Sequence, residues 1–91
     1  MAPHKAKDVP EPPWTRLGIT ETGWRALAAA FYELAHGDFR KFGELPGSLR
    51  ECSAGRLCSR FMETGDHEFV EQAGREITGT GDWYVYLGRM M

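Results

Sequence analysis

The sequence predicts one small α+β domain, with two or three helices packed against a small antiparallel β-sheet. Three observations lead to this prediction: a helical period in the first half, a strand-like alternation near the C-terminus, and a length of only 91 residues. Hydrophobic residues make up 42% of the chain, which suits one folded core and leaves little room for a large substrate pocket. We expect residues 14–91 to form this domain.

Residues 1–13 are expected to form a flexible tail. The segment holds four of the five prolines and no aromatic, leucine or isoleucine side chain that could anchor it. Because proline fixes φ and removes a backbone donor, such a segment favours a solvated or polyproline-like chain.

The first predicted helix begins after Thr20, a good N-cap, and ends before Gly37, which can adopt the left-handed conformation. Glu21 in its first turn faces the positive end of the helix dipole. Apolar side chains recur on one face at helical spacing: Trp24, Leu27, Ala28, Phe31, Leu34 and Ala35.

Two further helices are expected between residues 38 and 64. Asp38 can cap a short one that ends at Pro46, and residues 48–51 fit a capping box that opens a longer one, 48–64. The apolar face of the longer helix is not continuous. Either it is covered on two sides or it breaks near residues 53–55, and the sequence leaves both alternatives open.

The C-terminal third is expected to form strands. Residues 67–72 and 75–78 are two short candidates, and residues 79–82 have the composition of a hairpin loop. Residues 83–87 then alternate in the manner of a half-buried strand. The sequence therefore predicts a C-terminal β-hairpin.

In that last strand, Trp83, Val85 and Leu87 are expected to face the core. Tyr84 and Tyr86 would then share the opposite face, because successive strand residues point to opposite sides of a sheet.

The composition argues against a polycation and against a membrane protein. Eleven basic residues stand against thirteen acidic ones, whereas nonspecific binding to nucleic acid depends on an excess of Lys and Arg. No apolar run approaches the roughly 20 residues of a spanning helix, and residues 1–9 lack a secretory signal. Cys52 and Cys58 are too far apart on a helix for a disulfide. We expect a cytoplasmic protein with reduced thiols.

Catalytic patterns are missing from the sequence. It has no HExxH, CxxC, GxSxG or Walker spacing. Residues 66–68 would point to alternate faces of a strand and would not converge on a metal. Gly79 and Gly81 precede a predicted strand, the wrong order for a phosphate cradle. The sequence predicts no enzyme, no cofactor and no metal site.

A basic segment lies at residues 48–62, where three arginines stand against Glu51 alone. These arginines are Arg50, Arg56 and Arg60. They mark a candidate nucleic-acid-binding face, and the alternative is a solvated face on a packed helix.

The order of the predicted elements over residues 20–88 resembles a winged helix-turn-helix. The resemblance implies that helix 48–64 enters the major groove of DNA and that loop 79–82 is the wing. Wings that touch phosphate offer basic groups, whereas this loop carries Asp82 and has no Lys or Arg up to Tyr86.

An acidic segment lies at residues 63–76, with a net charge of −4 if His is neutral. Beside it, the predicted strand presents its two tyrosines, and tyrosine is enriched at protein interfaces. An acidic rim around aromatic side chains suits a basic protein surface. The candidate partner-binding residues are Glu68, Glu71, Glu76, Tyr84 and Tyr86. The alternative is a solubilising face.

Two functions are compatible with these patterns. The first is a non-enzymatic protein that binds a protein partner as an inhibitor or adaptor, a class often encoded by phages and mobile elements. The second is a winged-helix DNA-binding regulator. A homodimer is compatible with both.

Overall fold

The computed structural model of the chain describes residues 11–90, and all regular structure within them is α-helical. In chain order the helices are α2 (Pro13–Leu17), α3 (Glu21–Ala35), α4 (Arg40–Gly43), α5 (Gly47–Arg50), α6 (Ser53–Thr64), α7 (His67–Thr78) and α8 (Trp83–Met90). The predicted α+β class was therefore wrong, since the described residues contain no strand. The predicted tail falls largely on residues 1–10, outside the described part, and Pro13 opens α2.

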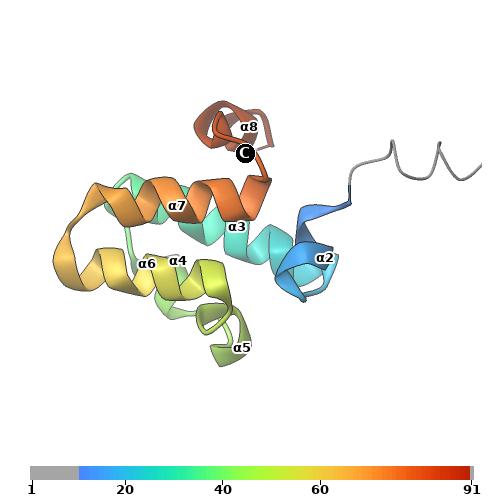
Figure 1. Cartoon of the computed structure of the whole chain (residues 1–91). Coiled ribbons are helices and arrows are strands. Elements are labelled where there is room, and N and C mark those ends of the chain that lie inside the picture. Colours follow the sequence, from blue (N-terminus) through green and yellow to red (C-terminus); the bar gives the residue numbers. More distant parts are fainter. Residues whose placement is uncertain (1–10, 91) are drawn as a thin grey trace, which may run out of the picture.

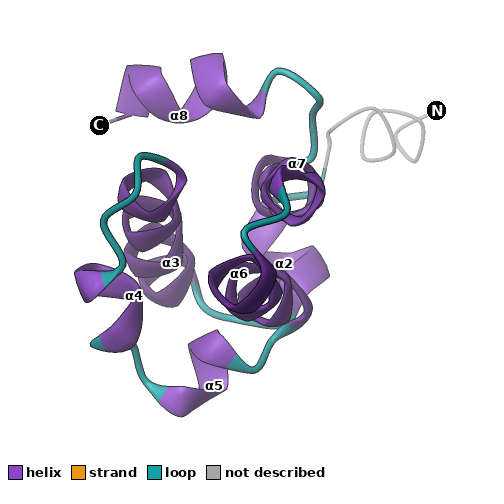
Figure 2. Ribbon diagram, turned by 90° about the vertical axis from the view of Figure 1, so that its left-hand side faces the viewer, coloured by secondary structure: helices purple, strands orange, loops and turns teal. Residues whose placement is uncertain are grey.

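The helices form two layers, and α8 packs across one side of them. Helices α6 and α7 run side by side in opposite directions, with α3 behind them (Figure 1). Helix α8 lies across α3 and α7, and no other helix of residues 11–90 covers its outer side (Figure 2). The largest fully buried side chains come from these four helices: Trp24, Phe31, Leu27, Leu34, Ile77, Leu87 and Cys58. Burial of each large apolar side chain contributes roughly 1.5–3 kcal/mol.

Helix α3 confirms the first predicted helix. The Thr20 side chain accepts a hydrogen bond from the Gly23 backbone N–H at 3.0 Å, and Gly37 has φ of 95°. The buried indole of Trp24 donates to the Ile77 carbonyl oxygen at 2.7 Å. Because the last carbonyls of a helix lack partners within it, this bond also satisfies the C-terminal turn of α7.

Helix α4 lies where the short helix was expected, but Phe39 and not Asp38 is its N-cap residue, and it ends at Gly43 before reaching Pro46. The Asp38 carboxylate accepts from the Arg40 backbone N–H at 3.1 Å and from its guanidinium at 2.8 Å. The bond from the Arg40 side chain, aided by the backbone bond, lowers the pKa of Asp38 to about 2. The Phe42 side chain is buried in the core.

The predicted helix 48–64 is two helices, and the break lies at Glu51 and Cys52, just before the predicted residues 53–55, which form the first turn of α6. Helix α5 ends at Arg50, Cys52 is extended, and α6 begins at Ser53. The predicted capping box does not form, because α5 begins after Pro46 without a side-chain cap. Gly55 lies directly against the carbonyl oxygens of α5. The missing side chain lets the two helices meet at this sharp corner.

Helix α7 replaces the predicted strands 67–72 and 75–78. The Asp66 carboxylate accepts from the Glu68 backbone N–H at 3.0 Å and caps the helix, and Gly79 with φ of 78° ends it. Its buried residues recur at helical spacing: Val70, Ala73, Gly74 and Ile77. This period was present in the sequence and outweighs the strand propensity of its apolar residues.

Helix α8 replaces the predicted last strand. Trp83 and Leu87 are buried, as expected, but Val85 is 54% exposed. Burial at i and i+4 follows a helix, whereas burial at i, i+2 and i+4 would follow a strand. Residues 79–82 connect two helices, so the expected hairpin and the expected wing do not form.

Neither α8 nor any other helix between residues 11 and 90 combines the length and the apolar character needed to cross a bilayer.

The two cysteines, both free, differ in environment, and this difference predicts their reactivity. Burial raises the pKa of the Cys58 thiol to about 12, while the half-buried Cys52 thiol donates to the Leu49 carbonyl oxygen at 3.2 Å. Since the thiolate is the nucleophile, alkylation at a pH of about 8.5 should modify Cys52 and spare Cys58 until the protein unfolds. Mass spectrometry of alkylated peptides measures both rates. Equal rates in the native protein would contradict the burial of Cys58.

Candidate protein-interaction surface

The three predicted glutamates lie on the solvent side of α7 but turn toward different neighbours. Glu76 accepts a hydrogen bond from the Ser53 hydroxyl of α6 at 2.6 Å. Glu71 accepts from the Trp83 indole N–H of α8 at 3.1 Å. Glu68 is exposed between these two directions. Glu71 therefore lies toward α8 and Glu76 toward α6, while Glu68 contacts neither helix through a hydrogen bond or ion pair among the described residues.

The two predicted tyrosines do not share a face. Two residues along an α-helix correspond to a rotation of roughly 200°, so Tyr84 and Tyr86 project to different sides of α8. Tyr84 lies toward α3, and Tyr86 lies toward α2 and the end of α7. The expectation of a common tyrosine face depended on a strand and was wrong for that reason.

Two of the three predicted arginines make contacts within the protein, and the third is exposed to solvent. The Arg50 side chain donates to the Leu45 carbonyl oxygen at 3.0 Å and supports the connection before α5. The Arg60 guanidinium lies over the Phe69 ring of α7, at 5.4 Å from its centroid. Arg56 is exposed on α6.

The basic and acidic segments are brought together by the pairing of α6 with α7. Ser53 contacts Glu76 at one end of the pair, and Arg60 contacts Phe69 farther along, which fixes the antiparallel alignment. Arginines of α6 therefore lie beside glutamates of α7 in one layer. Adjacent opposite charges weaken the field that either set would present alone.

Tyr84 is held in place by Tyr32 of α3 and by His36, the residue that follows α3, and the sequence did not single out either one for this site. Its ring stacks on Tyr32 with centroids 6.0 Å apart, and its hydroxyl lies 3.3 Å from His36 Nε2. His36 Nδ1 lies 2.7 Å from the Tyr32 carbonyl oxygen. Nδ1 must donate to that carbonyl, so Nε2 of a neutral ring accepts from the Tyr84 hydroxyl. We call Tyr32, His36 and Tyr84 the Tyr84 cluster.

The Tyr84 cluster is connected to the acidic side of α7 through Trp83. The Trp83 ring packs edge-to-face on Tyr84, with centroids 5.7 Å apart, and its indole N–H is bonded to Glu71. A signal for the cluster existed in the sequence. Tyr32 and His36 are four residues apart and therefore lie on one side of the first predicted helix.

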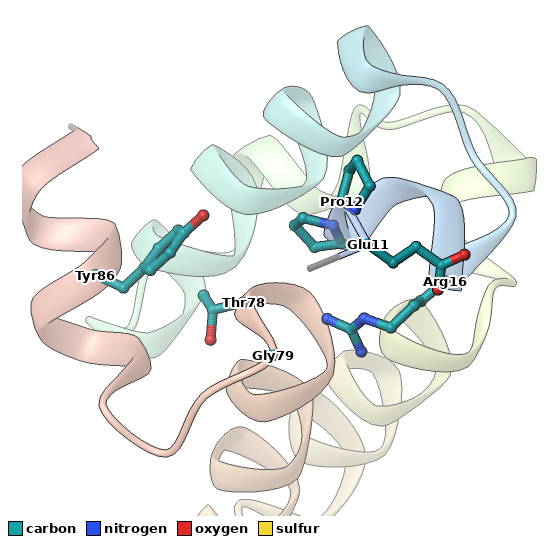
Figure 3. Close-up of a pocket in the computed structure, with 7 residues that line it drawn as sticks. Glu11, Pro12, Arg16, Thr78, Gly79 and Tyr86 are labelled. Atoms are coloured by element: carbon teal, nitrogen blue, oxygen red, sulfur yellow. The ribbon is translucent and has the colours of Figure 1, made fainter. Parts of the chain in front are cut away.

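A second surface lies on another side of α8. Asp82, Val85, Tyr86 and Arg89 line an open depression of about 370 Å³ together with Thr78 and Thr80. We call the first four residues the outer α8 stripe. Tyr86 also borders a neighbouring depression of about 560 Å³, toward which Arg16 reaches from α2 (Figure 3).

Large exposed hydrophobic side chains are concentrated on α8. Among the described residues, four of the six lie on this helix, and the other two are Phe39 and Met62. The four are Tyr84, Val85, Tyr86 and Met90. They lie on more than one side of the helix, Tyr84 toward α3 and Tyr86 toward α2, and exposed apolar patches mark interaction sites on soluble proteins.

Comparison with known proteins gives no match: no family model, no curated protein and no solved structure shows significant similarity to this chain. A function must therefore be argued from the surfaces themselves.

Proposed function

We propose that this protein is a small non-enzymatic interaction protein of the cytoplasm, which binds a protein partner as an inhibitor or adaptor. The observation that carries the proposal is the state of Tyr84, which is 53% exposed and yet fixed by Tyr32 and His36. A large aromatic side chain held in one orientation loses little entropy when a partner covers it. Tyrosine in such a position is often one of the few residues that contribute most of the binding free energy of an interface.

The charge around the Tyr84 cluster favours a basic polypeptide as the partner. Glu71 adjoins the cluster through Trp83, Glu68 is exposed one turn earlier on α7, and neither has an ion pair with another described residue. Complementary charge accelerates association and selects among partners. Glu76 and Tyr86, which point elsewhere, are not part of the proposed surface.

The DNA-binding alternative has less support. Its winged-helix form requires a hairpin, which residues 79–82 do not form. Its three arginines include Arg50, engaged with a backbone carbonyl, and Arg60, placed over an aromatic ring beside the acidic helix α7. Phosphate would meet carboxylates in the same layer.

Partner capture from a lysate of the native host should depend on Tyr84 and Glu68. The tagged full chain is used as bait, with and without nuclease, and captured proteins are quantified by mass spectrometry. Tyr84→Ala or Glu68→Lys should reduce recovery of the partner about tenfold or more. The first variant removes the aromatic ring at the centre of the proposed surface, and the second reverses a charge at its edge; both changes weaken binding.

Two variants serve as matched controls for this experiment. Phe39→Ala removes an exposed aromatic ring elsewhere, and Glu44→Lys makes the same charge change at another exposed position. Both should capture the partner as the parent chain does. Capture that survives Tyr84→Ala and Glu68→Lys, or that disappears with nuclease, would contradict the proposal.

A further inference from the structure

The outer α8 stripe has a charge pattern that is complementary to itself. Its residues Asp82, Val85, Tyr86 and Arg89 follow the spacing i, i+3, i+4, i+7, which places them along one side of a helix. Val85 is 54% and Tyr86 38% exposed. An acidic residue therefore stands at one end of an apolar pair and a basic residue at the other.

Asp82 and Arg89 have no ion-pair partner among the described residues, whose ion pairs join Arg25 to Glu21 and Arg40 to Asp38. We propose that a second copy of this chain packs antiparallel on the outer α8 stripe. A twofold axis between Val85 and Tyr86 exchanges the two ends of the stripe. Asp82 of each copy then faces Arg89 of the other.

The same axis places apolar groups at the centre of the contact. Val85 of one copy meets Tyr86 of the other, so each ion pair lies at the rim of a small apolar core, as in protein interfaces generally. Twofold contacts of this kind, in which one patch serves both subunits, are the commonest form of oligomer. An antiparallel contact requires opposite charges at the two ends of the stripe, and Asp82 and Arg89 provide them.

The predicted dimer is weak because the stripe is short. The eight residues of α8 span about 12 Å, so the contact falls at the small end of protein interfaces. A dissociation constant between about 1 µM and 1 mM is expected.

Dimerisation is independent of the partner surface proposed above. Tyr84 projects to another side of α8 and contacts α3, so both Tyr84 clusters remain uncovered in the dimer. Two such surfaces on one particle would bind a repetitive or dimeric partner with increased avidity.

A charge-swap experiment tests the dimer by sedimentation equilibrium of the full chain, over about 1 µM to 1 mM protein. Asp82→Arg places arginine opposite arginine, and Arg89→Asp places aspartate opposite aspartate. Each variant alone should dimerise about tenfold or more weakly than the parent chain. An equimolar mixture of the two should recover the association, because each contact then pairs arginine with aspartate.

Arg56→Asp and Glu44→Arg are the matched controls, since they change the same charges at exposed positions outside the stripe. They should leave the dimer unchanged. Val85→Lys tests the centre of the contact and should also weaken it about tenfold, with the helical circular dichroism of the parent chain. A parent chain that is monomeric throughout the range, or a mixture that does not recover association, would overturn the proposal.

Discussion

Replacing Gly74 with alanine is expected to lower the free energy of unfolding by about 3 kcal/mol. Gly74 lies in α7 directly beneath the Trp83 ring, and an added Cβ would overlap the ring and come within 2.7 Å of its Cδ1 atom. The ring has little freedom to move. It is 6% exposed and packs on Phe31 with ring centroids 5.1 Å apart, and its indole N–H donates a hydrogen bond to the Glu71 carboxylate.

Chemical denaturation followed by circular dichroism measures this effect, with Gly88→Ala as the control. Gly88 is also helical, and a Cβ there would meet only the Tyr32 hydroxyl oxygen, at an ordinary 3.9 Å. Gly88→Ala should leave stability unchanged or raise it by up to about 1 kcal/mol, because alanine favours a helix. Equal stabilities of the two variants would mean that Trp83 does not pack on α7.

Replacing Gly55 with alanine is expected to be equally damaging, at about 3 kcal/mol. An added Cβ would overlap the Leu49 carbonyl oxygen and lie 2.5 Å from that of Arg50. Both atoms belong to the backbone of α5, which cannot rotate away as a side chain can. The corner between α5 and α6 would have to open.

Gly43→Ala is the control for the α5–α6 corner, because no atom lies within 4 Å of a Cβ added there. The same denaturation experiment should find it close to the parent chain or slightly more stable. If Gly55→Ala were as stable as the parent chain, this result would contradict the close contact between Gly55 and the backbone of α5. A continuous helix from Ser48 to Thr64 would then describe the segment better.

The first helix could be predicted from the sequence because its signals are local and agree with one another. Thr20 caps it, a run of alanines favours it, and Gly37 ends it. Each of these effects acts within a few residues, so no distant part of the chain is needed to select the structure.

The C-terminal third was mispredicted because its local signals conflict. Residues 83–87 have the aromatic and β-branched composition of a strand, and five residues are too few for periodicity to decide. The decision comes from packing. Trp83 packs over Gly74 and Leu87 is buried in the core, while Val85 between them is 54% exposed, a pattern that fits a helix and not a half-buried strand.

Which side chains become neighbours at the candidate surface also depended on tertiary structure. The sequence predicted a common face for Tyr84 and Tyr86, but the helical state of α8 separates them. The pairing of α6 with α7 then brings Arg60 beside the acidic helix. Tyr32 and His36 join Tyr84 only because α8 crosses α3.

The sequence by itself therefore determined the extent of the first helix, but it left open whether residues 48–64 are continuous, and the structure places the break at Glu51 and Cys52. Caps, propensities and glycine conformations are properties of a few consecutive residues. Tertiary structure decided the state of residues 83–87 and the neighbours of each charged or aromatic side chain, whereas the helical spacing of Val70, Ala73 and Ile77 was already present in the sequence. The physical reason is that burial of Trp83 and Leu87 against distant helices outweighs the weak intrinsic preferences of a short segment.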